Sequence, residues 1–167
     1  MEMDTSKLQS VLDYLCQEVG GDWLLAGGAL VRLKFDASRG TEDMDLVKIR
    51  HKSLSDDAAK NKLFRWLIEQ GLGPEWVNSA MEPFVKDVPH WEQETVLIQK
   101  EKLGAIYRPT LTLFVYLKLR RASDTDLGDI RTAIPHCKEG FDESKFLSWS
   151  DKQLKTKFFE LRASLGL

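Results

Sequence analysis

The chain has 167 residues, of which 43% are hydrophobic, and it carries 26 acidic against 24 basic residues, a net charge of −2. This length fits one domain, or one domain with a small appendage, and the charge balance excludes a global attraction to nucleic acid or anionic membrane, although a local basic patch stays open. No run of eighteen apolar residues and no signal-like N-terminus is present, so we expect a cytoplasmic protein that neither spans nor binds a membrane.

The first half of the chain alternates helical and strand-like patterns. After a cap at Thr5 or Ser6, leucines and valines at helical spacing predict a helix that ends at Gly20. Short apolar runs bounded by glycine or polar residues are typical of buried strands. The expected elements that follow are a strand at 23–26, a helix at 29–35, a strand at 44–49 and a helix from 55 to 71.

The second half begins with a weak pattern over residues 73–88 and then becomes mainly helical. Strand-like segments at 94–100 and 103–107 come before Pro109, and helical spacing follows at 111–119 and 124–135. A capping-box pattern at Ser150 and Gln153 predicts the start of a last helix. We therefore expect an α+β fold with an α/β core at 1–108 and a helical C-terminal region at 109–167 packed on it.

Gly27 and Gly28 lie where the first predicted strand gives way to a helix. A glycine pair at such a turn lets backbone amides come close to an anion, and the helix adds the positive end of its dipole. Glycine pairs are also common in turns that bind nothing, and that alternative stays open.

Asp43 and Asp45 alternate along the next predicted strand, so their side chains share one face. Two ionised carboxylates on one face repel each other unless a positive charge lies between them, and Mg²⁺ with substrate phosphates is the usual partner. Arg39 and Thr41 come before the pair and can hydrogen-bond the carboxylates or a phosphate. The alternative is that the aspartates cap a neighbouring helix or pair with Arg39.

The Gly-Gly pair and the later run Arg39-Gly-Thr-Glu-Asp-Met-Asp-Leu46 together resemble the signature of the nucleotidyltransferase superfamily, the DNA-polymerase-beta-like folds. The closest likeness is to minimal bacterial members related to the AbiEii abortive-infection toxins, in which Met44 is usually isoleucine. The resemblance implies a mixed β-sheet with flanking helices, magnesium (or manganese in its place) as cofactor, and a nucleoside triphosphate as substrate. It implies metal ligation by Asp43 and Asp45 and nucleotide binding by Gly27, Gly28, Arg39, Thr41 and Lys118.

A second segment supports the same resemblance. Lys118, followed by Asp126 and Asp129 three residues apart, resembles the family's later Lys … Asp-Leu-x-Asp-Leu motif on two consecutive helices. The likeness implies catalytic roles for these three residues besides Asp43 and Asp45, with Lys118 on the triphosphate and one aspartate orienting it or acting on the acceptor hydroxyl. The alternative for each aspartate is a structural role as a helix cap or in i,i+3 pairing.

The sequence departs from the family pattern in one respect. Many active members carry a third carboxylate on a later strand, where it acts as a base toward the attacking hydroxyl. Glu92 and Glu94 are the candidates here, and neither has the apolar-acid-apolar surroundings that this role needs.

Two functions are therefore expected from the sequence. The first is a magnesium-dependent transfer of a nucleoside monophosphate to a hydroxyl of RNA, such as tRNA, or of a protein, in a toxin–antitoxin or phage-defence setting implied by the resemblance. The second is a catalytically degenerate module that binds nucleotide or a partner protein, as an antitoxin or scaffold does. Phe158 and Phe159 bear on the second function, because adjacent residues on a helix point in different directions and one of them can be exposed.

Overall fold

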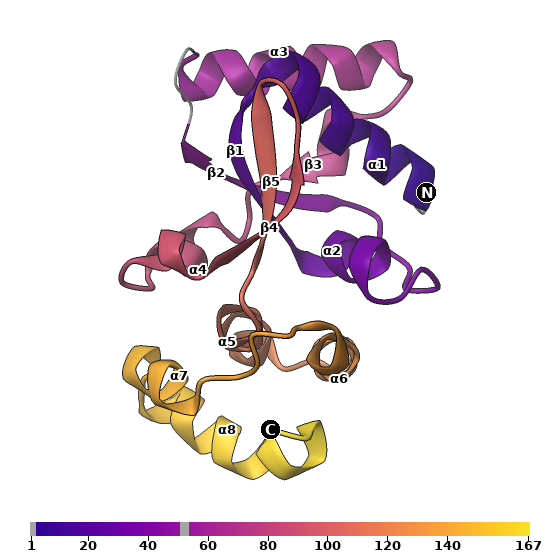
Figure 1. Cartoon of the computed structure of the whole chain (residues 1–167). Helices are drawn as coiled ribbons and strands as arrows, with labels where there is room; N and C mark the ends of the chain where they lie inside the picture. Colours follow the sequence, from indigo (N-terminus) through magenta and orange to yellow (C-terminus); the bar gives the residue numbers. More distant parts are fainter. Residues whose placement is uncertain (1–2, 51–53) are drawn as a thin grey trace. The chain divides into compact units, whose positions relative to one another are not determined.

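The computed structural model describes residues 3–50 and 54–167 (Figure 1). Its α-helices are α1 (Thr5–Tyr14), α2 (Gly27–Lys34), α3 (Asp56–Glu69), α4 (Glu82–Lys86), α5 (Leu111–Arg121), α6 (Asp124–Ala133), α7 (Glu143–Trp149) and α8 (Lys152–Leu165). Its strands are β1 (Gly21–Ala26), β2 (Met44–Arg50), β3 (Val77–Asn78), β4 (Thr95–Lys100) and β5 (Gly104–Pro109). Shorter helical segments are a π-helix at Leu15–Val19 and 3₁₀ turns at Pro74–Trp76, Trp91–Gln93 and Ile134–His136.

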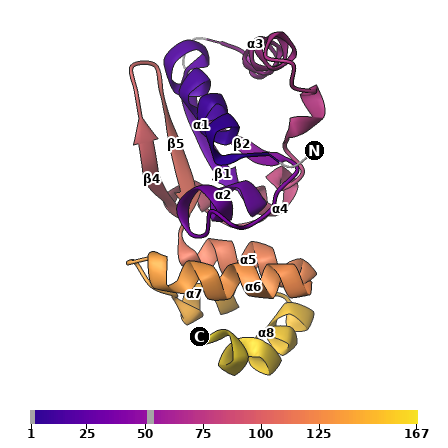
Figure 2. The same cartoon turned by 90° about the vertical axis from the view of Figure 1, so that its right-hand side faces the viewer.

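Within the described part of the chain, the five strands form one mixed sheet in the order β3-β2-β1-β5-β4. The central strand β1 pairs antiparallel with β2 and parallel with β5, and β2 pairs parallel with β3. Strands β4 and β5 are joined by only three residues, a connection short enough for a hairpin but not for a parallel crossover. Figure 2 shows this hairpin at one edge of the sheet. The expected α+β fold, with a mixed sheet, flanking helices and a helical C-terminal region, is confirmed.

The chain divides into two compact units, one of Met1–Glu82 with Val96–Arg108 and the other of Pro83–Thr95 with Pro109–Leu167. In the first unit, α1 contributes Leu8 and Leu12 to the core and the π-helix that continues it contributes Leu15, each fully buried. This spacing places the three leucines on one helical face. The central strand adds the buried pair Leu24 and Leu25, so both faces of the sheet are covered at β1.

The second unit is a small helical bundle with an aromatic core. Figure 2 shows α5 and α6 side by side in it. Phe146 of α7 and Phe158 of α8 are fully buried, with ring centroids 4.7 Å apart. The neighbouring Phe159 is 53% exposed, which confirms that the two adjacent phenylalanines point in different directions. Among the described residues, no helix combines the length and the apolar character needed to cross a membrane.

Two helix starts differ from the sequence prediction by one residue. The first helix is capped by Asp4, whose carboxylate accepts from the Lys7 amide at 2.8 Å, and not by Thr5 or Ser6. The last helix is capped by Asp151, which accepts from the Leu154 amide, whereas the Ser150 hydroxyl donates to the preceding turn. In both places a carboxylate replaces the predicted hydroxyl, as expected where a full negative charge meets the positive end of a helix.

Candidate functional site

Gly27 stands at the junction of β1 and α2, directly against the carboxylate of Asp45. Its backbone has φ +70°, and a Cβ placed on it would lie only 2.3 Å from Asp45 Oδ2. The sheet explains this approach, because Ala26 and Asp45 are partners in the antiparallel pairing of β1 with β2. The structure therefore holds the Asp45 carboxylate at the bend that opens α2, where the positive end of the helix dipole favours negative charge.

Gly28 has a different pair of neighbours. A Cβ there would lie 3.0 Å from the Thr41 hydroxyl and 3.1 Å from the Arg39 guanidinium. A hydroxyl and a cation thus lie over the second glycine, while a carboxylate lies over the first. Such donors next to a glycine bend are what the recognition of phosphate oxygens requires.

The loop between α2 and β2 is tied down by hydrogen bonds that hold Arg39 and Thr41 in place. The Arg32 guanidinium donates to the Arg39 carbonyl at 2.9 Å, and the Met3 amide donates to the Thr41 carbonyl at 2.9 Å. The Thr41 hydroxyl donates to the carbonyl of Asp43 at 3.0 Å. Thr41 is itself buried, so this segment is a fixed part of the first unit.

Asn78 contacts both aspartates of the candidate site, although the sequence analysis did not identify it. It is the partner of Asp45 in the pairing of β2 with β3, and its side-chain amide donates to Asp43 Oδ2 at 2.8 Å. The side-chain oxygen Oδ1 of Asn78 accepts from the backbone amide of Ala80 at 2.9 Å, and this second bond fixes the orientation of the side chain. Strand β3 is only two residues long and lies in a segment with weak patterning, so a short polar residue there carried no signal.

The oxygen donors around the bend suit a hard divalent cation. Asp43 is exposed and Asp45 half-buried, and both are carboxylates on alternate positions of one chain segment. Among the described residues, no group of three or more histidines, cysteines or acids is arranged to hold a metal. Two carboxylates are ligands of the type that magnesium takes together with phosphate oxygens and water, so the residue types present are compatible with such an ion.

The second unit contains an ion-pair cluster in which Lys118 binds both Asp126 and Asp129. The Lys118 ammonium donates to Asp126 Oδ1 at 3.1 Å and to Asp129 Oδ2 at 2.7 Å. All three side chains are buried, with 8%, 1% and 3% exposed. The two aspartates thus hold Lys118 in a fixed place on the α5–α6 pair, as was considered from the sequence for one of them.

Asp126 has further partners besides Lys118. Arg121 donates to both of its oxygens, at 2.6 and 2.7 Å, and the Ser123 hydroxyl donates at 2.7 Å in a capping box at the start of α6. Burial alone would raise the pKa of Asp126, but the hydrogen bonds from Arg121 and Ser123, together with the charge of Lys118, lower the pKa below its usual value. Asp126 is therefore an ionised carboxylate over the whole neutral pH range.

The two candidates for a third carboxylate are also placed in the second unit. Glu94 is buried, accepts from the Thr110 hydroxyl at 3.0 Å and pairs with Lys145 at 2.5 Å. Glu92 is exposed, and its carbonyl accepts from the Thr95 hydroxyl. The contacts of Glu94 are those of a structural ion pair that joins the start of β4 to α7.

Comparisons with known proteins add no relative: protein-family models, curated proteins and solved structures were each searched, and none of them matches this chain.

Proposed function

We propose that the chain is a minimal nucleotidyltransferase-type protein that binds a nucleoside triphosphate and magnesium at the bend between β1 and α2. The observation that carries the proposal is the position of the Asp45 carboxylate, whose Oδ2 lies only 2.3 Å from where a Cβ on Gly27 would be. The α+β fold with its mixed sheet is compatible with this superfamily. The resemblance of the 27–46 segment supports the same assignment.

Each residue at the bend has a distinct part in the proposed binding. Gly27 and Gly28 carry no side chain, so the Asp45 carboxylate can approach the first and the Arg39 guanidinium the second at the start of α2. Arg39 would donate to the phosphates beside Gly28, and Thr41, whose hydroxyl donates to the Asp43 carbonyl, would hold the loop in position there. The charge of the triphosphate would thus be met by a guanidinium and the positive end of a helix.

Asp43 and Asp45 would hold the magnesium ion, with Asn78 keeping Asp43 in its orientation. When bound, magnesium neutralises developing charge on the transferred phosphoryl group. Lys118, Asp126 and Asp129 are proposed for the same reaction on the resemblance alone, and the acceptor is a hydroxyl of RNA or of a protein. A toxin–antitoxin or phage-defence setting follows from the same resemblance.

A transfer assay tests the proposal. The chain is incubated with each α-labelled triphosphate and Mg²⁺, with and without total RNA, and the label on RNA and on protein is measured. We expect transfer by the wild type and none by Asp45→Asn, because asparagine has nearly the same size and shape but lacks the negative charge that a metal needs. Equal transfer by both proteins would contradict the proposal.

A second function is favoured by the position of Glu94. Its carboxylate is committed to Lys145 and Thr110, so the sequence candidate for a catalytic base has a structural role instead. This favours a module that binds a triphosphate, or a partner protein, without turnover. Calorimetry separates the two functions, since triphosphate binding in the absence of any transfer identifies the module.

A further inference from the structure

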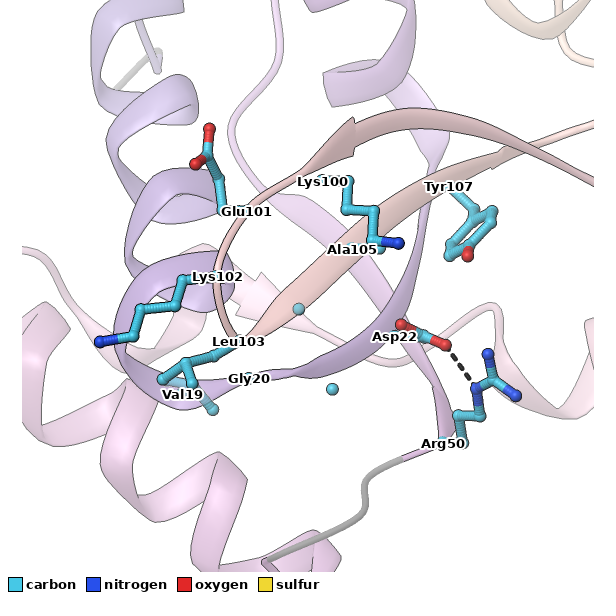
Figure 3. A pocket seen from close by; sticks show the side chains of 12 residues that line it. Val19, Gly20, Asp22, Arg50, Lys100, Glu101, Lys102, Leu103, Ala105 and Tyr107 are labelled. Carbon is cyan, nitrogen blue, oxygen red and sulfur yellow. Dashed lines mark hydrogen bonds and ion pairs between the residues drawn. The ribbon is translucent and has the colours of Figure 1, made fainter.

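A polar hollow lies in the first unit, at the end of β1 opposite the Gly27 bend. It has a volume of about 280 Å³ and is bounded by the start of β1, the end of β2 and the β4–β5 hairpin (Figure 3). Strand β1 separates it from Gly27 by five residue steps, roughly 16 Å in an extended strand. The hollow is thus a separate site from the one proposed for nucleotide and metal.

The floor of the hollow is nearly free of side chains because two strands meet there through glycines. Gly21 of β1 is the partner of Gly104 of β5, and a Cβ on Gly104 would lie 2.4 Å from the Gly21 carbonyl oxygen. The next partners in the register are Asp22 and Ala105. The hollow is therefore a basin whose floor consists of these small residues and whose rim consists of the larger side chains around them.

The side chains that stand around the basin are mainly hydrogen-bond donors. Figure 3 shows Lys100 and Tyr107 on the same side of the hairpin as the Asp22–Arg50 pair. Lys100 makes no ion pair, and the Tyr107 hydroxyl no hydrogen bond, with any residue that the structure describes. The lining holds the cations Arg50, Lys100 and Lys102 against the carboxylates of Glu101 and Asp22, and of the two carboxylates only Asp22 lies on the same side as Lys100 and Tyr107 in Figure 3.

That carboxylate is already neutralised. Asp22 pairs with Arg50 through the Nε atom at 2.5 Å, and the side chain of Asp22 is only 17% exposed. The Arg50 side chain is 68% exposed, so the rest of its guanidinium fork stays accessible to a ligand. Glu101 and Lys102 also line the hollow, but the charged ends of their side chains point away from Lys100 and Tyr107 in Figure 3.

We propose that this basin binds a phosphate monoester through Lys100, Arg50 and the Tyr107 hydroxyl. A phosphate suits the site because its oxygens accept from a point charge, a guanidinium fork and a phenol at once. The volume lies just below the usual range of about 300–1,000 Å³ for small-molecule pockets, which suits a ligand no larger than a single nucleotide. The proposal goes beyond the function proposed for the Gly27 bend and does not depend on it.

The test is a titration of the full chain at fixed ionic strength with inorganic phosphate and, separately, with a nucleoside monophosphate, followed by amide NMR. We expect shifts at Gly20, Gly21 and Gly104, and a dissociation constant about tenfold weaker in Lys100→Gln, as for one lost charge-assisted hydrogen bond. Stronger binding of the nucleotide than of phosphate would identify a nucleotide as the source of the phosphate, and equal binding would identify the phosphate group alone.

Two controls keep the test specific. Lys102→Gln removes the same charge from the same hairpin, but the charged end of the Lys102 side chain points away from Lys100 and Tyr107, so the affinity of this variant should stay within about twofold of wild type. Asp45→Asn alters the other site, so the shifts at Gly20 and Gly21 should be unchanged in that variant. The proposal is overturned if these amides do not shift, or if Lys100→Gln and Lys102→Gln weaken binding equally.

Discussion

The carboxylate of Asp45 occupies the space that a side chain on Gly27 would need, with only 2.3 Å between Asp45 Oδ2 and the position of a Cβ. A Gly27→Ala substitution must therefore displace the carboxylate as well as adopt φ +70°. We expect a loss of about 2 kcal/mol or more in the free energy of unfolding, since the left-handed conformation alone costs about 1–2 kcal/mol. Denaturant unfolding measures this loss, and triphosphate binding should be lost as well.

Gly71 offers a matched control for that substitution. It has φ +72°, and a Cβ on it would meet no atom within 4 Å. Gly71→Ala should therefore show only the backbone cost of about 1–2 kcal/mol, with triphosphate binding unchanged. If the two variants behave alike, the contact between Gly27 and Asp45 has no energetic or functional weight.

Removal of the Asp126 charge should destabilise the second unit. Asp126→Asn leaves the buried Lys118 with one carboxylate fewer, and we expect a loss of about 3 kcal/mol at pH 7, since breaking one side of a buried ion pair costs about 3–5 kcal/mol. Asp124→Asn, an exposed change in the same helical turn, should stay within about 0.5 kcal/mol of wild type. Urea unfolding measures both.

The same carboxylate predicts a pH dependence with a defined sign. The pKa of Asp126 is lower in the folded protein than its usual value of 3.8, so its contribution is complete above that value and is lost as the pH falls toward the folded pKa. The difference in unfolding free energy between wild type and Asp126→Asn should therefore be constant from pH 5 to 7 and shrink below about pH 4. A difference that grows on acidification would show that Asp126 is not stabilised as an ion.

A substitution at Gly128 is expected to increase the stability of the protein. This glycine lies inside α6, and a Cβ added to it would meet no atom within 4 Å. Gly128→Ala should stabilise the protein by about 0.5–1 kcal/mol, because alanine loses less backbone entropy than glycine on entering a helix. A decrease in the thermal unfolding midpoint of this variant would contradict the arrangement of α6 in the second unit.

Cys16 should be chemically inert in the folded protein. The thiol is fully buried, and burial raises its pKa to about 12, with nearby acids adding to the effect. The reactive thiolate is therefore scarce at pH 8. Native protein should leave Cys16 unlabelled by iodoacetamide at that pH, as read by peptide mass spectrometry, whereas labelling should be complete in denaturant. Rapid labelling of native protein would contradict the placement of Cys16.

The main elements of the fold were predictable because their hydrophobic periods are regular. The leucines of α1 and the apolar run of β1 each define a buried face without help from the rest of the chain. Helix caps were less predictable, because Asp4 and Ser6 are both acceptable cap residues and only the backbone path selects one. Strand β3 was missed because two residues contain no period.

The candidate site was predictable only where residue type and local spacing identify its residues. Gly27 and Asp45 are recognisable by residue type and spacing, but the contact between them follows from the register of β1 with β2. Asn78 was not predictable, since it reaches Asp43 only through the pairing of β3 with β2. The partners of Glu94 and Lys118 depend in the same way on tertiary packing.

The most direct measurement of the central claim is calorimetric binding of a non-hydrolysable triphosphate analogue, with and without Mg²⁺, to the wild type and to Asp43→Asn/Asp45→Asn. We predict Mg²⁺-dependent binding to the wild type, and binding at least tenfold weaker to the double variant, because the carboxylates supply the protein's share of the metal ligands. Equal, magnesium-independent affinities for the two folded proteins would contradict the claim that these aspartates hold a metal–nucleotide complex at the Gly27 bend.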